Sequence, residues 1–86
     1  MNILILKYPN PTHNIFLLEG ILKEALQLQI EIVNHLGERI TFYDLGKLSS
    51  FKNQISMSNF CTGIYFIRVI SSENAKCLAT KKIVVE

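Results

Sequence analysis

The sequence contains no tryptophan and only two cysteines, two histidines and one aspartate. Cys61 and Cys77 allow at most one bridge, which excludes a disulfide framework and a paired-cysteine zinc pattern. We expect two small, buried or half-buried hydrophobic side chains, with a bridge or a reactive thiol as alternatives. His13 and His35 fall in predicted turns, and Asp44 has no second carboxylate with a contrasting environment. The sequence therefore predicts no metal, no cofactor and no catalytic residue.

Long apolar runs and clusters of basic charge are also missing. No stretch reaches the roughly 18 apolar residues of a membrane-spanning helix. The first residues lack the basic start, long apolar stretch and cleavage site of a signal peptide, so we expect no export signal there. Lys81 and Lys82 are the only adjacent basic pair, and the formal net charge is +2. This balance argues against nucleic-acid binding and against electrostatic docking to a membrane.

The residues that are present indicate a small folded β domain. The 86 residues suffice for one domain, spanning 1–86, and exclude large two-lobed enzymes. Hydrophobic residues make up 49% of the chain and charged residues 19%, which is too apolar for a disordered tail. Isoleucine is the most frequent apolar residue, with 12 copies. Its branching at Cβ suits the pleated surface of a sheet better than a helix.

Alternating apolar residues and turn signals at intervals near ten residues predict about seven short strands, hence an all-β sandwich. The clearest strands are expected at 2–8, 15–18, 26–33, 39–43, 64–70 and 76–86, with a weaker alternation around Ile55 and Met57. The 21–28 segment is ambiguous, because its high helix propensity competes with the period-two pattern that starts at Leu26. We favour a strand from 26, with 21–25 as an irregular lead-in and a helix over 21–28 as the alternative.

Turns punctuate the predicted strands. Tyr8-Pro9-Asn10-Pro11 should form an extended corner, because proline fixes φ and restricts the residue before it. Asn34-His35-Leu36-Gly37 suits a type I turn whose last residue takes a positive φ. Cys61-Thr62-Gly63 precedes the strongest strand, in which Arg68 marks the wetter face. Tyr65, Ile67 and Val69 should then point into the core.

These punctuating motifs occur in a particular order: Tyr8-Pro9-Asn10-Pro11, then Asn34-His35-Leu36-Gly37, then Gly63-Ile64-Tyr65, and Lys82-Ile83-Val84-Val85-Glu86 at the end. The order and spacing of these motifs resemble those of the type A C-terminal sorting domain of the type IX (Por) secretion system of Bacteroidetes-type bacteria. The resemblance covers about residues 5–86. The family turn usually begins with Asp where this chain has Asn34, and Phe60-Cys61 replaces a Leu-Pro pair.

The resemblance implies a small Ig-like antiparallel β-sandwich at the end of a secreted cargo protein, with no enzymatic activity of its own. Such a domain is a sorting signal. The outer-membrane translocon recognises it after the cargo has reached the periplasm through the cargo's own N-terminal signal. A sortase-like transpeptidase then removes it, and the cargo is joined to an anionic lipopolysaccharide at the cell surface or released into the medium.

The resemblance also implies which residues form the recognition motif. They are Pro9, Asn10, Pro11, Asn34, Gly37, Gly63, Tyr65, Lys82, Ile83, Val84 and Val85. Each has a structural interpretation as well, since prolines fix corners, glycines supply positive φ and Tyr65 fills the core. An alternative is a β-sandwich binding or adhesion module for glycans or proteins, suggested by Tyr8 and Tyr43. A small thiol enzyme acting through Cys61 is a third hypothesis.

Overall fold

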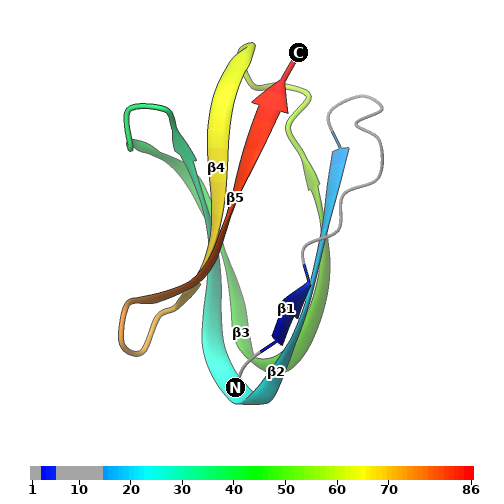
Figure 1. Cartoon of the computed structure of the whole chain (residues 1–86), viewed down its shortest axis with the longest axis vertical. Helices are drawn as coiled ribbons and strands as arrows, with labels where there is room; N and C mark the ends of the chain where they lie inside the picture. The colour runs from blue at the N-terminus through cyan, green and yellow to red at the C-terminus, as the bar shows by residue number, and fades with distance from the viewer. Residues whose placement is uncertain (1–2, 6–14) are drawn as a thin grey trace.

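A computed structural model describes residues 3–5 and 15–86, and these residues form one antiparallel sheet (Figure 1). The strands are β1 (Ile3–Ile5), β2 (Ile15–Asn34), β3 (Arg39–Ser56), β4 (Gly63–Ser71) and β5 (Lys76–Val85). The sheet order is β1-β2-β4-β5, and β3 pairs with β2 along its other edge. β2 is therefore the central strand, and its second half lies between β3 and β4.

The long hairpin of β2 and β3 bends sharply near its middle. Ile21 pairs with Ser50 and Leu26 with Leu48, so residues 22–25 of β2 stand opposite the single residue 49 of β3. Extra residues in one strand bend it and increase its twist. Figure 1 shows β2 and β3 turning together through this corner at the bottom of the view. The bend brings the first half of the hairpin to face β4 and β5.

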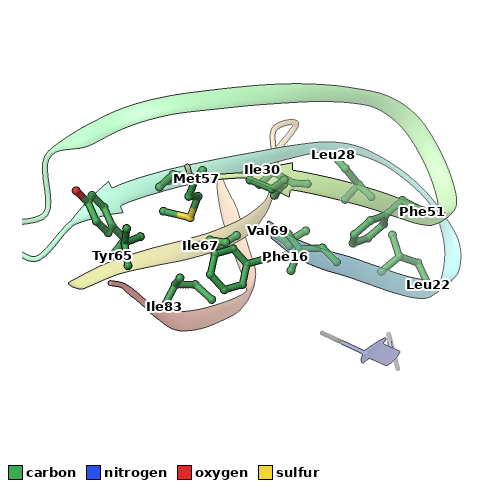
Figure 2. Close-up of a cluster of buried hydrophobic side chains, with 14 residues drawn as sticks. Phe16, Leu22, Leu28, Ile30, Phe51, Met57, Tyr65, Ile67, Val69 and Ile83 are labelled. Atoms are coloured by element: carbon green, nitrogen blue, oxygen red, sulfur yellow. The ribbon is translucent and has the colours of Figure 1, made fainter. Parts of the chain in front are cut away.

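The core lies between the two halves of this bent sheet. Leu22, Leu28 and Phe51 lie inside the corner, and Tyr65 lies near the opposite end (Figure 2). The cluster contains residues from β2, β3, β4 and β5 and the loop after β3: Phe16, Leu18, Leu22, Leu28, Ile30, Ile32, Phe51, Ile55, Met57, Tyr65, Ile67, Val69, Ile83 and Val85. Burial of these apolar side chains is the main favourable contribution to folding.

The all-β class is confirmed, but the prediction of about seven strands in a sandwich is wrong. Within the described residues there are four long strands and the three-residue β1, all in one sheet. The miscount arises because two expected interruptions lie inside strands. Gly20, which lies beyond the end of the predicted strand 15–18, is paired with Phe51 within the β2–β3 ladder. The predicted strands 15–18 and 26–33 are therefore parts of one β2.

Gly46 is the second glycine that lies inside a strand, although a strand end was expected before it. Leu28 pairs with Gly46 and Gln29 with Asp44, which leaves Leu45 as an extra residue in β3. Gly46 takes φ +81° there, a conformation that glycine adopts without steric cost. The residues just beyond the predicted strand 39–43 thus form a β-bulge, and β3 continues to Ser56.

The remaining secondary-structure predictions have mixed outcomes. The favoured strand from 26 is confirmed, and the alternative helix over 21–28 is wrong, because that segment belongs to β2. The expected irregularity at 21–25 coincides with the register shift at the corner. Of the predicted strand 2–8, residues 3–5 are described and form β1. The Tyr8-Pro9-Asn10-Pro11 corner lies outside the described residues.

Candidate functional site

The predicted turn after β2 is confirmed in detail. The Gly37 N–H donates to the Asn34 carbonyl oxygen at 3.0 Å, and Gly37 has φ +84°. The Asn34 side chain stabilises the turn from within, because its Oδ1 accepts hydrogen bonds from the Leu36 N–H at 2.9 Å and the Glu38 N–H at 3.0 Å. Asparagine therefore serves as the turn's cap where the resembled family usually has aspartate.

Replacing this cap gives a first prediction. Asn34→Ala should lower the free energy of unfolding by about 1–2 kcal/mol, because two main-chain N–H groups lose their acceptor. Urea denaturation of the purified chain measures the change. Ser49→Ala provides a control, since Ser49 is an exposed residue of β3, and should change stability by less than about 0.5 kcal/mol. Equal stability of both variants and the parent chain would show that the turn does not depend on Asn34.

Tyr65, at the start of β4, closes the loop that precedes it. Its hydroxyl donates to the Cys61 carbonyl oxygen at 2.6 Å, and its ring meets Phe60 edge-on with the centroids 5.3 Å apart. The ring is buried, which confirms the prediction that Tyr65 is a core residue. Gly63 has φ +158°, close to extended backbone, and a Cβ there would lie 3.9 Å from the Tyr65 ring, an ordinary contact.

β5 presents its four motif residues on alternate faces. Ile83 and Val85 are each 2% exposed and belong to the core. Lys82 and Val84 point away from the core and are exposed. Within the described part of the chain β5 pairs only with β4. The predicted terminal strand is thus a sheet edge whose outer side chains are accessible.

The sheet places the described motifs side by side. Asn34 of β2 pairs with Tyr65 of β4, and Tyr65 pairs with Ile83 of β5. Gly63 pairs with Val85 in the same ladder. Figure 1 shows the start of β4 and the end of β5 at the top of the view. Three motifs that are about 20–30 positions apart in the sequence therefore meet at one end of the sheet, a consequence of antiparallel pairing between neighbouring strands. Pro9, Asn10 and Pro11 lie outside the described residues.

The outer face of the sheet holds an ion-pair cluster that sequence reasoning missed. Glu31 of β2 is only 8% exposed although it faces away from the core. Its Oε2 accepts a hydrogen bond from Arg39 Nε at 2.8 Å, and Arg68 Nη1 lies 3.0 Å from Oε1. The guanidinium of Arg39 also lies over the Phe42 ring, 4.6 Å from its centroid. The alternating polar positions of β2 and the wet face of β4 were visible in the sequence, but their register was not.

Removal of the central carboxylate gives a second prediction. Glu31→Gln should lower the free energy of unfolding by about 1–2 kcal/mol, because a buried carboxylate that forms ion pairs with two arginines loses its charge. The two arginines are half-exposed and regain water, which limits the cost. Glu19→Gln is the matched control, since the Glu19–Lys52 pair is longer, at 3.7 Å, and more exposed. It should cost less than about 0.5 kcal/mol, and an equal cost for both variants would contradict the special role of Glu31.

The expectation of buried cysteines is wrong. Cys61 and Cys77 are both exposed, and both are free. Cys77 pairs with Ile70, which is seven residues and so roughly 23 Å along β4 from Gly63, at about 3.3 Å per residue. Cys61 lies only two residues before Gly63, at the far end of β4 from Cys77. A disulfide needs Cα atoms within about 7 Å, so an intramolecular bridge does not fit this fold.

The Cys77 thiol has a polar setting at the start of β5. Partial burial raises its pKa, but hydrogen bonds from Thr80 and Arg68 and the charge of Arg68 outweigh this, and the net pKa lies below the ordinary value. The thiol-enzyme hypothesis concerned Cys61, which lies in the loop before β4. Within residues 3–5 and 15–86, no group of three histidine, cysteine or acidic side chains comes together as a metal site. That part of the chain also contains no helix that could cross a membrane.

These observations define a small, all-β module in which the three described sequence motifs meet at one end of the sheet. A family model described as the secretion system C-terminal sorting domain matches residues 7–86. The chain therefore belongs to this family, and it is a C-terminal sorting signal of the type IX secretion system. No curated protein and no solved structure matches the chain.

Family membership confirms the resemblance and gives the chain its role. A sorting domain is a signal carried by a cargo, and the family is not a known enzyme family. Its cargo is directed to the cell surface or the medium. Nothing in these comparisons supports the adhesion alternative. Tyr8 lies outside the described residues, and Tyr43 is an exposed side chain of β3.

Proposed function

We propose that the chain acts as a single folded sorting domain, spanning residues 1–86, at the end of a longer cargo protein. The type IX translocon binds the end of the sheet where the motifs meet, and a sortase-like transpeptidase then separates the domain from its cargo. The cargo is joined to an anionic surface lipopolysaccharide or released. In this proposal the cargo enters the periplasm through its own N-terminal signal.

The observation that carries the proposal is the row formed by Asn34, Tyr65 and Ile83 on three adjacent strands. It supports two different roles among the predicted recognition residues, one structural and one in contact with the receptor. Asn34, Gly37, Gly63, Tyr65, Ile83 and Val85 hold this end of the sheet in shape. Lys82 and Val84 are exposed on β5 and are available to a receptor. Pro9, Asn10 and Pro11 remain predicted members of the recognition motif.

Processing of a fusion protein tests the proposal. A fluorescent reporter with an N-terminal export signal is joined to the start of the chain and expressed in a type IX-competent host. The reporter recovered outside the cell should be smaller than the fusion by about the 9.8 kDa of this domain, or should carry lipopolysaccharide in its place. Mass spectrometry of the reporter's new C-terminus identifies the product. External reporter that still carries the whole domain would contradict removal by a transpeptidase.

A further inference from the structure

Two long strands have an edge without a partner strand among the described residues, namely β3 and β5. The edge of β3 is interrupted by the corner opposite 22–25, by the Gly46 bulge and by a shift near Arg39. The edge of β5 has one shift, near Leu78, and is regular from Ala79 to Val85. An added strand needs an unbroken row of main-chain donors and acceptors. β5 therefore offers the better site for strand addition.

The charge of β5 selects among possible partners. Lys76, Lys81 and Lys82 give the segment Lys76–Val85 three positive charges and no acidic residue. The whole chain has a net charge of +2, so the rest of the chain has a net charge of −1 (2 − 3). Pairing of β5 with β5 of a second copy would bring two positively charged segments together, which is electrostatically unfavourable. An acidic segment is the complementary partner.

The exposed side chains of β5 define the spacing of that partner. Val84 is 49% exposed and pairs with Ile64 of β4, which is 39% exposed. Lys82 lies two residues away on the same face of the strand, and no ion pair to Lys82 occurs within residues 3–5 and 15–86. A neighbouring strand would therefore place one apolar side chain beside Val84 and one carboxylate beside Lys82, two residues apart.

We propose that β5 binds an acidic, extended segment of a type IX component as an added strand, with a carboxylate beside Lys82 and an apolar side chain beside Val84. This inference rests on the proposed function, because it names the chemistry of the receptor that reads the sorting domain. Main-chain hydrogen bonds along Ala79–Val85 provide affinity, and the two outward side chains provide selectivity.

Peptide binding to the purified 86-residue chain tests the chemistry directly. The probe is a nine-residue peptide with glutamate and valine alternating on one face and threonine on the other, and its counterpart has lysine in place of glutamate. In nuclear magnetic resonance titrations the glutamate peptide should shift the amides of Ala79–Val85 and bind about tenfold more tightly than the lysine peptide. Equal affinity, or shifts confined to β3, would overturn the proposal.

Charge reversal sharpens this titration. Lys82→Glu should abolish or reverse the preference for the glutamate peptide, and Lys47→Glu should leave it unchanged. Lys47 is the matched control, because it is an exposed lysine on the other long free edge, β3. Thermal unfolding checks that each variant is folded. If Lys82→Glu does not fold, Lys82→Gln is used in its place. A preference that survives both Lys82 variants would also contradict the proposal.

Export of the reporter fusion separates this inference from the function on which it rests. Lys82→Glu should reduce export by about tenfold and Lys47→Glu should not, since only the first opposes an acidic receptor strand. If the parent chain itself fails to direct export, the proposed function is wrong. If the parent chain directs export and Lys82→Glu does so equally well, only the acidic-strand inference is wrong.

Discussion

A reporter fused to the chain is expected to lose about nine-tenths or more of its export when Lys82–Glu86 is removed. The truncation deletes Ile83 and Val85, which are buried, and each contributes about 1.5–3 kcal/mol of apolar burial. It also removes the exposed end of the β5 edge, and residues 63–66 of β4 lose their pairing with β5. Quantitative immunoblotting of medium, surface and periplasm measures the loss.

A double substitution separates folding from recognition in this experiment. Lys82→Glu with Val84→Thr changes only exposed side chains and keeps Ile83 and Val85 in the core. It should unfold at nearly the same urea concentration as the parent chain and yet be exported poorly. Normal export of the truncated chain would mean that the end of β5 has no part in sorting.

Ile67→Ala should lower the free energy of unfolding by about 3–4 kcal/mol, because it deletes buried methyl and methylene groups and leaves a cavity. Ile67 is 0% exposed and lies in the centre of β4, paired with Ile32 and Lys81. A chain of 86 residues has a total stability of only about 4–13 kcal/mol. The variant should therefore be marginally folded at 37 °C, and urea denaturation quantifies the change.

Ile64→Ala is the matched control for this prediction. Ile64 is the same residue type on the same strand, but it lies on the outer face and is 39% exposed. Its substitution should cost no more than about 1 kcal/mol. Similar losses for both variants would contradict the assignment of the inner and outer faces of β4.

The local parts of this fold could be predicted from the sequence. Alternation of polar and apolar residues predicted the strand from 26 and the buried face of β4, because side chains of a strand alternate between its faces. Asn34 and Gly37 predicted the turn between β2 and β3, because the turn requires a cap and a positive φ within four residues. Each of these features depends on neighbouring residues alone.

The number of strands could not be predicted in the same way. Gly20 and Gly46 have the local character of turn residues, but the ladder between β2 and β3 continues past both. Continuity there depends on pairing with residues about 20–30 positions away, which a local pattern does not contain. The same limit applies to Glu31, whose partners Arg39 and Arg68 come from two other strands.

The recognition motif was predicted as separate segments, and the sheet supplied their arrangement. Lys82, Ile83, Val84 and Val85 were predicted members of the recognition motif, and β5, which contains them, is an edge strand among the described residues. The adjacency of Asn34, Tyr65 and Ile83 required the order of β2, β4 and β5. The prediction for the cysteines was wrong. Their small apolar side chains suggested burial, but both are exposed.

Export of the reporter fusion in two hosts tests the central claim most directly. One host has an intact type IX system, and the other lacks its outer-membrane translocon. The signal-bearing reporter, fused to the intact 86-residue chain, should reach the surface or medium of the first host and accumulate in the periplasm of the second. Equal distribution of the reporter in both hosts would contradict the role of this chain as a type IX sorting signal.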